Sequence, residues 1–127
     1  MTTLTVPFLA GALFATVAVA SAQDHTAAVM YVQSFMAPAM IEVCRVALPG
    51  SGARQEALLV RWREKNRETI AQGERDLRAA RRGEGTSLEA ALDSKRDALL
   101  QQLRAMSEPA RIERCLTLMD ILESESR

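Results

Sequence analysis

Two cysteines constrain this chain more than any other feature, because each is the only thiol available to the other. Cys44 and Cys115 would enclose a loop of about 70 residues, and a bridge closing such a loop is expected to stabilise a fold by about 4 kcal/mol. An even number of cysteines in a small exported protein predicts a structural disulfide. A redox-active pair is the alternative. It is disfavoured because the spacing is not C-x-x-C and neither thiol is flanked by His or Lys.

The export signal lies at the start of the chain. Residues 4–20 carry no charge and fall slightly short of the roughly 20 apolar residues that span a bilayer. They are followed by Ala20-Ser21-Ala22, the small-x-small pattern that signal peptidase cleaves. We therefore expect residues 1–22 to be a signal peptide, cleaved before Gln23. An uncleaved membrane anchor is the alternative, because Met1-Thr2-Thr3 contains no basic side chain.

The remainder has the size and charge of a single soluble domain. Removing 22 of the 127 residues leaves 105, and we expect residues 23–127 to form one domain. The 16 basic and 16 acidic side chains balance, which argues against binding to nucleic acids or to anionic membranes. These features predict a periplasmic or secreted protein with no nucleic-acid partner and no membrane association after cleavage. The composition, rich in Ala and Arg, favours a bacterial source.

The sequence predicts an all-α fold. Ala, Leu, Arg, Glu and Gln dominate, and apolar residues recur at helical spacing. We expect a small antiparallel bundle of about four helices, stapled by the Cys44–Cys115 disulfide. The expected helices are 26–48, a long second helix 53–82, a third over 88–106 and a last one after Ser107-Glu108-Pro109. The narrow apolar stripes of the second and third helices leave an alternative, in which these two helices project as an arm.

Two local features refine this prediction. The first helix should be central and mostly buried, with its polar residues gathered on one solvent-exposed face. These residues are Ser34, Pro38, Glu42 and Arg45. The third helix should begin with a capping box, in which Thr86 is the N-cap and Glu89 reaches back to it.

One candidate contact site follows a single line of the second helix. It consists of Trp62, Asn66, Ile70 and Gly73. Asn66 on an apolar face could bind a ligand or a partner, although such an Asn more often fixes helix register. A glycine in mid-helix costs about 1 kcal/mol relative to Ala, so we expect a close approach at Gly73, made by the third helix.

A second candidate is a basic cluster near the end of the same helix. Its members are Arg75, Arg78, Arg81 and Arg82. Four guanidinium groups could bind an anion or an acidic partner. A solvated helix end is the simpler alternative, since cations are favoured at a helix C-terminus and Glu74 can pair with Arg78.

The absence of catalytic motifs argues against an enzyme. The sequence contains no G-x-S-x-G, no H-E-x-x-H and no Gly-rich phosphate loop, and we expect neither a bound metal nor a cofactor. The leading hypothesis is a non-catalytic interaction module, whose partner is an envelope protein or a second copy of the chain. The alternatives are a carrier of a small apolar ligand or haem, and an inhibitor or immunity protein against an envelope-acting enzyme.

Overall fold

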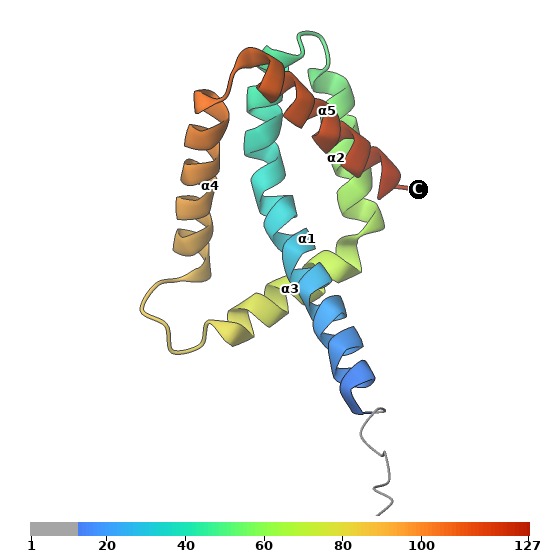
Figure 1. Cartoon of the computed structure of the whole chain (residues 1–127), viewed down its shortest axis with the longest axis vertical. Helices are drawn as coiled ribbons and strands as arrows, with labels where there is room; N and C mark the ends of the chain where they lie inside the picture. The colour runs from blue at the N-terminus through green and yellow to red at the C-terminus, as the bar shows by residue number, and fades with distance from the viewer. Residues whose placement is uncertain (1–12) are drawn as a thin grey trace, which may run out of the picture.

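The computed structural model describes residues 13–127, with side chains from Thr26 onward. This part of the chain is all-helical, as the sequence predicts, and Figure 1 shows its five helices. They are α1 (Leu13–Ala47), α2 (Gly52–Lys65), α3 (Arg67–Ala80), α4 (Leu88–Ala105) and α5 (Glu108–Ser124). The expected signal peptide lies outside the residues whose side chains are described, so its cleavage stays a prediction.

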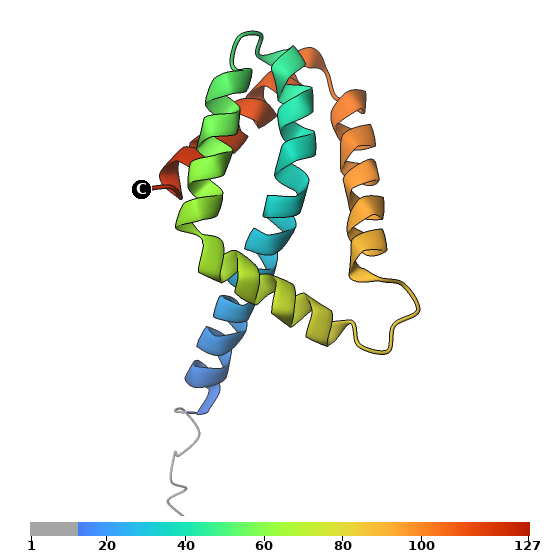
Figure 2. The same ribbon diagram turned by 180° about the vertical axis from the view of Figure 1, so that it is seen from behind.

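Helix α1 is the centre of the fold, and each of the other four helices contacts it. Helix α2 runs back beside α1, and α3 then crosses α1 (Figure 2). Helix α4 lies beside α1 and runs in the same direction as α1. Helix α5 then crosses α1 and α2. The arrangement is therefore a helical assembly around α1 rather than the regular four-helix bundle that we expected.

The long second helix is where the prediction is wrong, because the segment 53–82 contains two helices that meet at Asn66. The Asn66 side-chain amide donates to the Trp62 carbonyl at 2.9 Å and to the Glu125 carbonyl at 3.1 Å. The second acceptor lies 59 positions further along the chain. The bend is therefore fixed by a contact with the end of the chain.

The close approach predicted at Gly73 exists, but its partner is α1 and not the helix over 88–106. Gly73 is buried, and a Cβ atom added there would overlap the Ala27 carbonyl group and lie 2.9 Å from the Cβ of Tyr31. Because α3 and α4 each pack on α1, the alternative of a projecting two-helix arm is also wrong.

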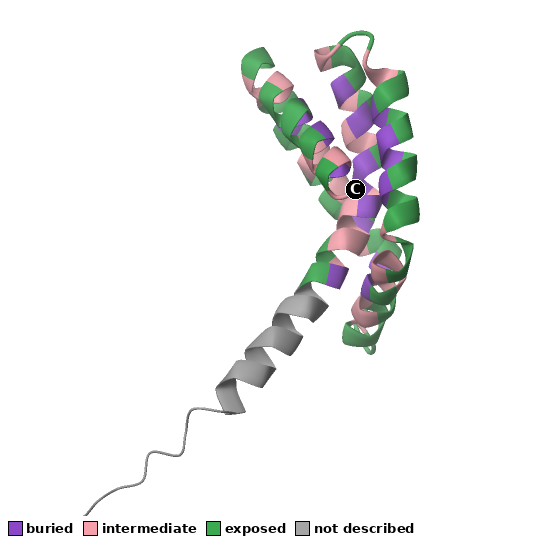
Figure 3. Cartoon of the chain, turned by 90° about the vertical axis from the view of Figure 1, so that its right-hand side faces the viewer, coloured by how far each residue is buried: buried purple, intermediate pink, exposed green. Residues whose placement is uncertain are grey.

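Two hydrophobic clusters form the core. The larger one joins α1, α2 and α5 around Trp62, Ile41 and Leu122, and the smaller one joins α1 and α4 through Met36, Leu88 and Leu92. Figure 3 shows the buried residues on the faces that the helices turn toward one another.

The predicted disulfide is confirmed. Cys44 of α1 and Cys115 of α5 are bonded at 2.05 Å, with their Cα atoms 5.5 Å apart. Their residues are only 1% and 2% exposed, respectively. The disulfide therefore fixes the register between the first and last helices from inside the core.

The prediction of a solvent-exposed face on α1 is only partly correct. Pro38, Glu42 and Arg45 are exposed, and the last two form an ion pair at 3.2 Å. Ser34 is buried, and its hydroxyl is satisfied by donating a hydrogen bond to the Tyr31 carbonyl. Val46, which we expected to be covered, is 82% exposed. Its apolar surface is therefore left without a partner in the described chain.

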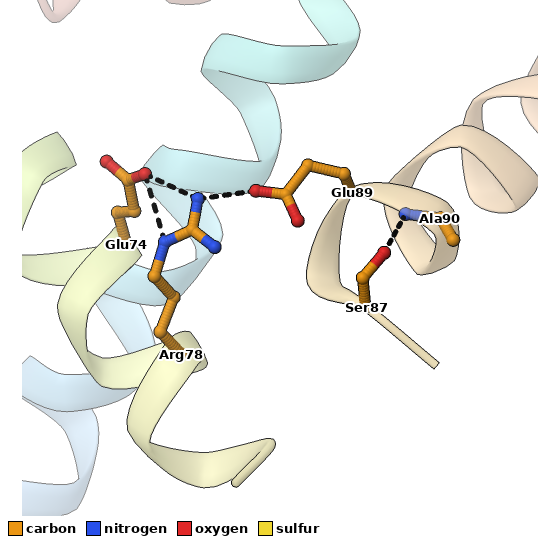
Figure 4. Close-up of polar contacts among 5 residues, drawn as sticks. All are labelled: Glu74, Arg78, Ser87, Glu89 and Ala90. Atoms are coloured by element: carbon orange, nitrogen blue, oxygen red, sulfur yellow. Dashed lines mark hydrogen bonds and ion pairs between the residues drawn. The ribbon is translucent and has the colours of Figure 1, made fainter. Parts of the chain in front are cut away.

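The N-cap of α4 is Ser87 and not Thr86. The Ser87 hydroxyl accepts a hydrogen bond from the backbone N–H of Ala90 at 3.1 Å (Figure 4). Glu89, the other half of the expected capping box, turns outward to Arg78 instead. The cap therefore begins one residue later than the sequence pattern indicates.

Because Ser87 and not Thr86 caps α4, substitution by alanine should have different effects on stability at these two neighbouring positions. Ser87→Ala should lower the free energy of unfolding by about 1 kcal/mol, because one N–H at the start of α4 loses its acceptor. Thr86→Ala is the matched control and should have almost no effect. Urea unfolding of both variants measures the difference, and equal losses would contradict the assignment.

Helix α1 also meets the length and composition criteria for a membrane span, over Thr26–Ala47. Core helices of soluble proteins meet the same criteria. In this chain the segment carries Cys44 of the disulfide and contacts the four other helices, so packing accounts for the apolar residues on its covered faces. Only 28% of the apolar span is buried in the described chain, however, and its exposed apolar surface includes Val46.

Candidate functional site

An open groove with a volume of about 1390 Å³ lies along one face of α1, between α2 and α4. We call it the front groove. Figure 2 shows the backbones of α1, α2 and α4, which carry most of the lining residues, and α3 where it crosses α1. Side chains from α1, α2, α4 and the first turn of α5 line it. The groove is therefore assembled by all the segments that surround this face of α1.

The floor of the front groove is largely apolar. It is formed by Phe35, Pro38, Ala39, Val43, Val46 and Ala47 of α1, and Leu100 of α4 adds to one wall. Val46 exposes 82% of its surface, far more than is usual for a valine on a helix that forms the core. An apolar floor in an open groove is typical of a binding surface.

The rim of the front groove carries more positive than negative charge. Four arginines and two glutamates line it: Arg63, Arg96, Arg104, Arg111, Glu42 and Glu108. The guanidinium of Arg96 lies 5.5 Å from the ring centre of Phe35 and pairs with Asp93 at 3.1 Å. Arg104 forms no ion pair within the described chain, so its charge is available to a bound group.

Two rim arginines also hold the groove together. The Arg63 guanidinium donates to the Ser34 carbonyl at 2.7 Å and links α2 to the floor. Arg111 donates to the carbonyls of Arg104 and Met106 at 3.1 and 2.6 Å, and so satisfies acceptors at the end of α4. The groove walls are thus fixed by polar contacts as well as by packing.

The predicted basic cluster is distributed among separate partners. Arg78 bridges Glu74 at 2.9 Å and Glu89 at 2.6 Å, and so joins α3 to α4 (Figure 4). These hydrogen bonds hold the pKa of the Glu89 carboxyl below its usual range and raise the pKa of Arg78. Arg81 pairs with Glu84 at 3.3 Å and donates to the Thr86 carbonyl.

The two remaining arginines of this cluster differ from each other. Arg75 donates to Gln72 at 2.7 Å, whereas Arg82 forms no ion pair in the part of the chain that the structure describes. An anion-binding role for the four arginines stays a prediction, but Arg78 and Arg81 already serve the α3–α4 connection.

The four residues predicted as a contact site along the second helix all make contacts within the fold. The indole N–H of Trp62 donates to the Glu125 carboxylate at 3.1 Å, and Ile70 packs against the larger core cluster. Asn66 and Gly73 form the bend and the helix crossing described above. Each of these residues therefore has a structural role in the described chain.

A second hollow, the rear pocket, lies on the opposite face of α1. Its volume is about 280 Å³, and residues from α1, α4 and α5 form most of its lining. The apolar lining includes Val32, Met36, Met40, Leu99, Leu118 and Ile121, with Trp62 at its inner wall. Arg114, Gln33 and Thr117 supply its polar groups. This composition is typical of a small-molecule site.

The sequence reasoning missed the front groove, although a signal was present. We expected Val43 and Val46 to be covered, but both lie on the same side of α1 as Pro38 and Glu42, which we expected to be solvent-exposed. Neighbouring apolar side chains on an exposed helix face form a contiguous patch, which is typical of a binding surface. Burial of Phe35 and Leu100 at the groove could not be predicted, because it depends on how α4 returns along α1.

Comparisons with protein families, curated proteins and solved structures found no match to this chain. Among the residues with described side chains, no group of three or more His, Cys, Asp or Glu is arranged to hold a metal ion. The functional argument therefore rests on the two hollows and on the charges around them.

Proposed function

We propose that this protein is a non-catalytic interaction module, which binds an acidic amphipathic helix of a partner protein in the front groove. The observation that carries this proposal is the combination of an open apolar floor with an arginine-rich rim. A helix laid in such a groove buries its apolar face on the floor and directs its carboxylates to the rim. Among the four rim arginines, Arg104 is the one whose side chain forms neither an ion pair nor a hydrogen bond within the described chain.

The size of the groove favours a polypeptide over a small molecule. Sites for small molecules are typically about 300–1,000 Å³ and enclose most of the ligand. The front groove, at about 1390 Å³, exceeds this range and is open along its length. A helical segment of a protein fits these dimensions better than a metabolite does.

The compartment of action is also a proposal. The apolar N-terminal region is compatible with a signal sequence, and the disulfide suggests an oxidising environment. We propose that the protein works in the periplasm or outside the cell. Its partner would then be an envelope or secreted protein.

Site-specific photo-crosslinking tests the proposal. A photoreactive phenylalanine analogue at Val46, on the groove floor, should cross-link one partner protein in intact cells of the host. The matched control is Val60, an exposed valine of α2 that is outside the groove and 65% exposed. Val60 should yield at least about tenfold less product.

The charge of the partner is tested in the same assay. Arg104→Glu should reduce cross-linking from Val46 by about tenfold, whereas Arg61→Glu, on exposed α2 surface, should not. Equal products from Val46 and Val60 would contradict the groove as the binding site. A product of twice the chain mass would instead identify a homodimer, and an enzyme as the cross-linked protein would favour the inhibitor or immunity alternative.

A further inference from the structure

We propose that the rear pocket binds a small amphiphilic carboxylate, such as a medium-chain fatty acid, with its carboxylate at Arg114 and its apolar tail inside the pocket. This site is separate from the front groove, because the two hollows lie on opposite faces of α1. The proposal also does not depend on a partner protein.

The register between α1 and α5 places the one charged lining residue, Arg114, at the disulfide end of the pocket. The disulfide holds Cys44 beside Cys115, with their Cα atoms 5.5 Å apart. Arg114 directly precedes Cys115, and Met40 lies one helical turn before Cys44, so both line the disulfide end of the pocket. The helices run in opposite directions from there, which places Val32 and Ile121 toward the other end.

Charge complementarity selects the head group. Arg114 is the only charged residue that lines the rear pocket, and it is exposed and forms no ion pair within the described chain. A carboxylate at Arg114 would gain a charge-assisted hydrogen bond. Gln33 adjoins Val32 in α1, so its side-chain amide lies toward the other end of the pocket and not at Arg114.

Volume selects the size of the ligand. The volume of about 280 Å³ lies just below the usual range for small-molecule sites, about 300–1,000 Å³, and aliphatic and thioether groups make up most of the walls. Methionines such as Met36 and Met40 adapt their shape to flexible apolar chains. A single short acyl chain matches this space.

Trp62 supplies a built-in reporter for the test. It is the only tryptophan of the chain, is 1% exposed and lines the rear pocket. Titration of the purified protein with octanoate should change the fluorescence of Trp62 in a saturable manner. Native mass spectrometry should show one octanoate per chain.

The variant Arg114→Gln should weaken octanoate binding about tenfold, which corresponds to about 1.4 kcal/mol. It should leave the affinity for octan-1-ol unchanged, because the alcohol carries no charge. Arg61→Gln, on exposed α2 surface outside both hollows, is the matched control and should bind octanoate like the native protein. The absence of a saturable change in the folded protein would overturn the proposal, as would equal octanoate affinities for Arg114→Gln and the native chain.

Discussion

Gly73→Ala should lower the melting temperature of this protein by about 10 °C or more. A Cβ at this position overlaps the backbone of α1 at Ala27, and backbone cannot yield as the end of a flexible side chain can. Overpacking of this kind typically costs 1–3 kcal/mol, and alanine recovers about 1 kcal/mol through its higher helix propensity. Because the overlap is with backbone and α3 must move off α1 as a unit, we expect the cost to reach about 3 kcal/mol, the upper end of this range, which leaves a net loss of about 2 kcal/mol. In a domain of this size, each kcal/mol shifts the melting temperature by about 4–8 °C.

Gly85→Ala is the control for this substitution. Gly85 lies in the α3–α4 loop, where an added Cβ meets nothing within 4 Å and the backbone does not adopt a positive φ. The same chemical change there should leave the melting temperature unchanged or slightly raised. Thermal unfolding followed by circular dichroism compares the two variants. If Gly73→Ala melts with the native protein, α3 does not rest on Ala27.

The prediction made for Gly73 illustrates what the sequence could and could not predict. A glycine in mid-helix indicates a close approach, and that inference is confirmed. The partner could not be predicted, because it depends on the direction that α3 takes after Asn66. An asparagine is tolerated within a helix, so residues 53–82 read as one continuous element. The bend depends on the Glu125 carbonyl, which no local pattern connects to Asn66.

The candidate sites show the same division between local and tertiary information. The all-α class and the Cys44–Cys115 disulfide follow from composition, periodicity and the even number of cysteines, and both are confirmed. The front groove arises from the space that α4 leaves beside α1, and its walls come from segments far apart in the sequence. Residue types alone therefore directed attention to Trp62 and Gly73, whose contacts lie within the fold, rather than to Val46 and Arg104.

Removal of the disulfide should have the largest effect of all. A double variant with Cys44→Ala and Cys115→Ala should melt roughly 20 °C below the native protein. The bond restricts an unfolded loop of about 70 residues, for which the entropic estimate is about 4 kcal/mol. This is a large share of the 5–15 kcal/mol that stabilises a typical domain. Native protein treated with reductant under unfolding conditions should approach the same melting temperature.

A second pair of substitutions separates the lost bond from the polarity of its replacement. Cys44→Ser with Cys115→Ser introduces two hydroxyl groups at positions that are 1% and 2% exposed, so it should be less stable than the alanine pair. The difference between the two variants measures the cost of burying those groups, and the alanine pair measures the bond. An alanine pair that melts with the native protein would contradict the entropic argument. The helices α1, α2 and α5 would then hold their register through the core around Trp62 and Leu122 alone.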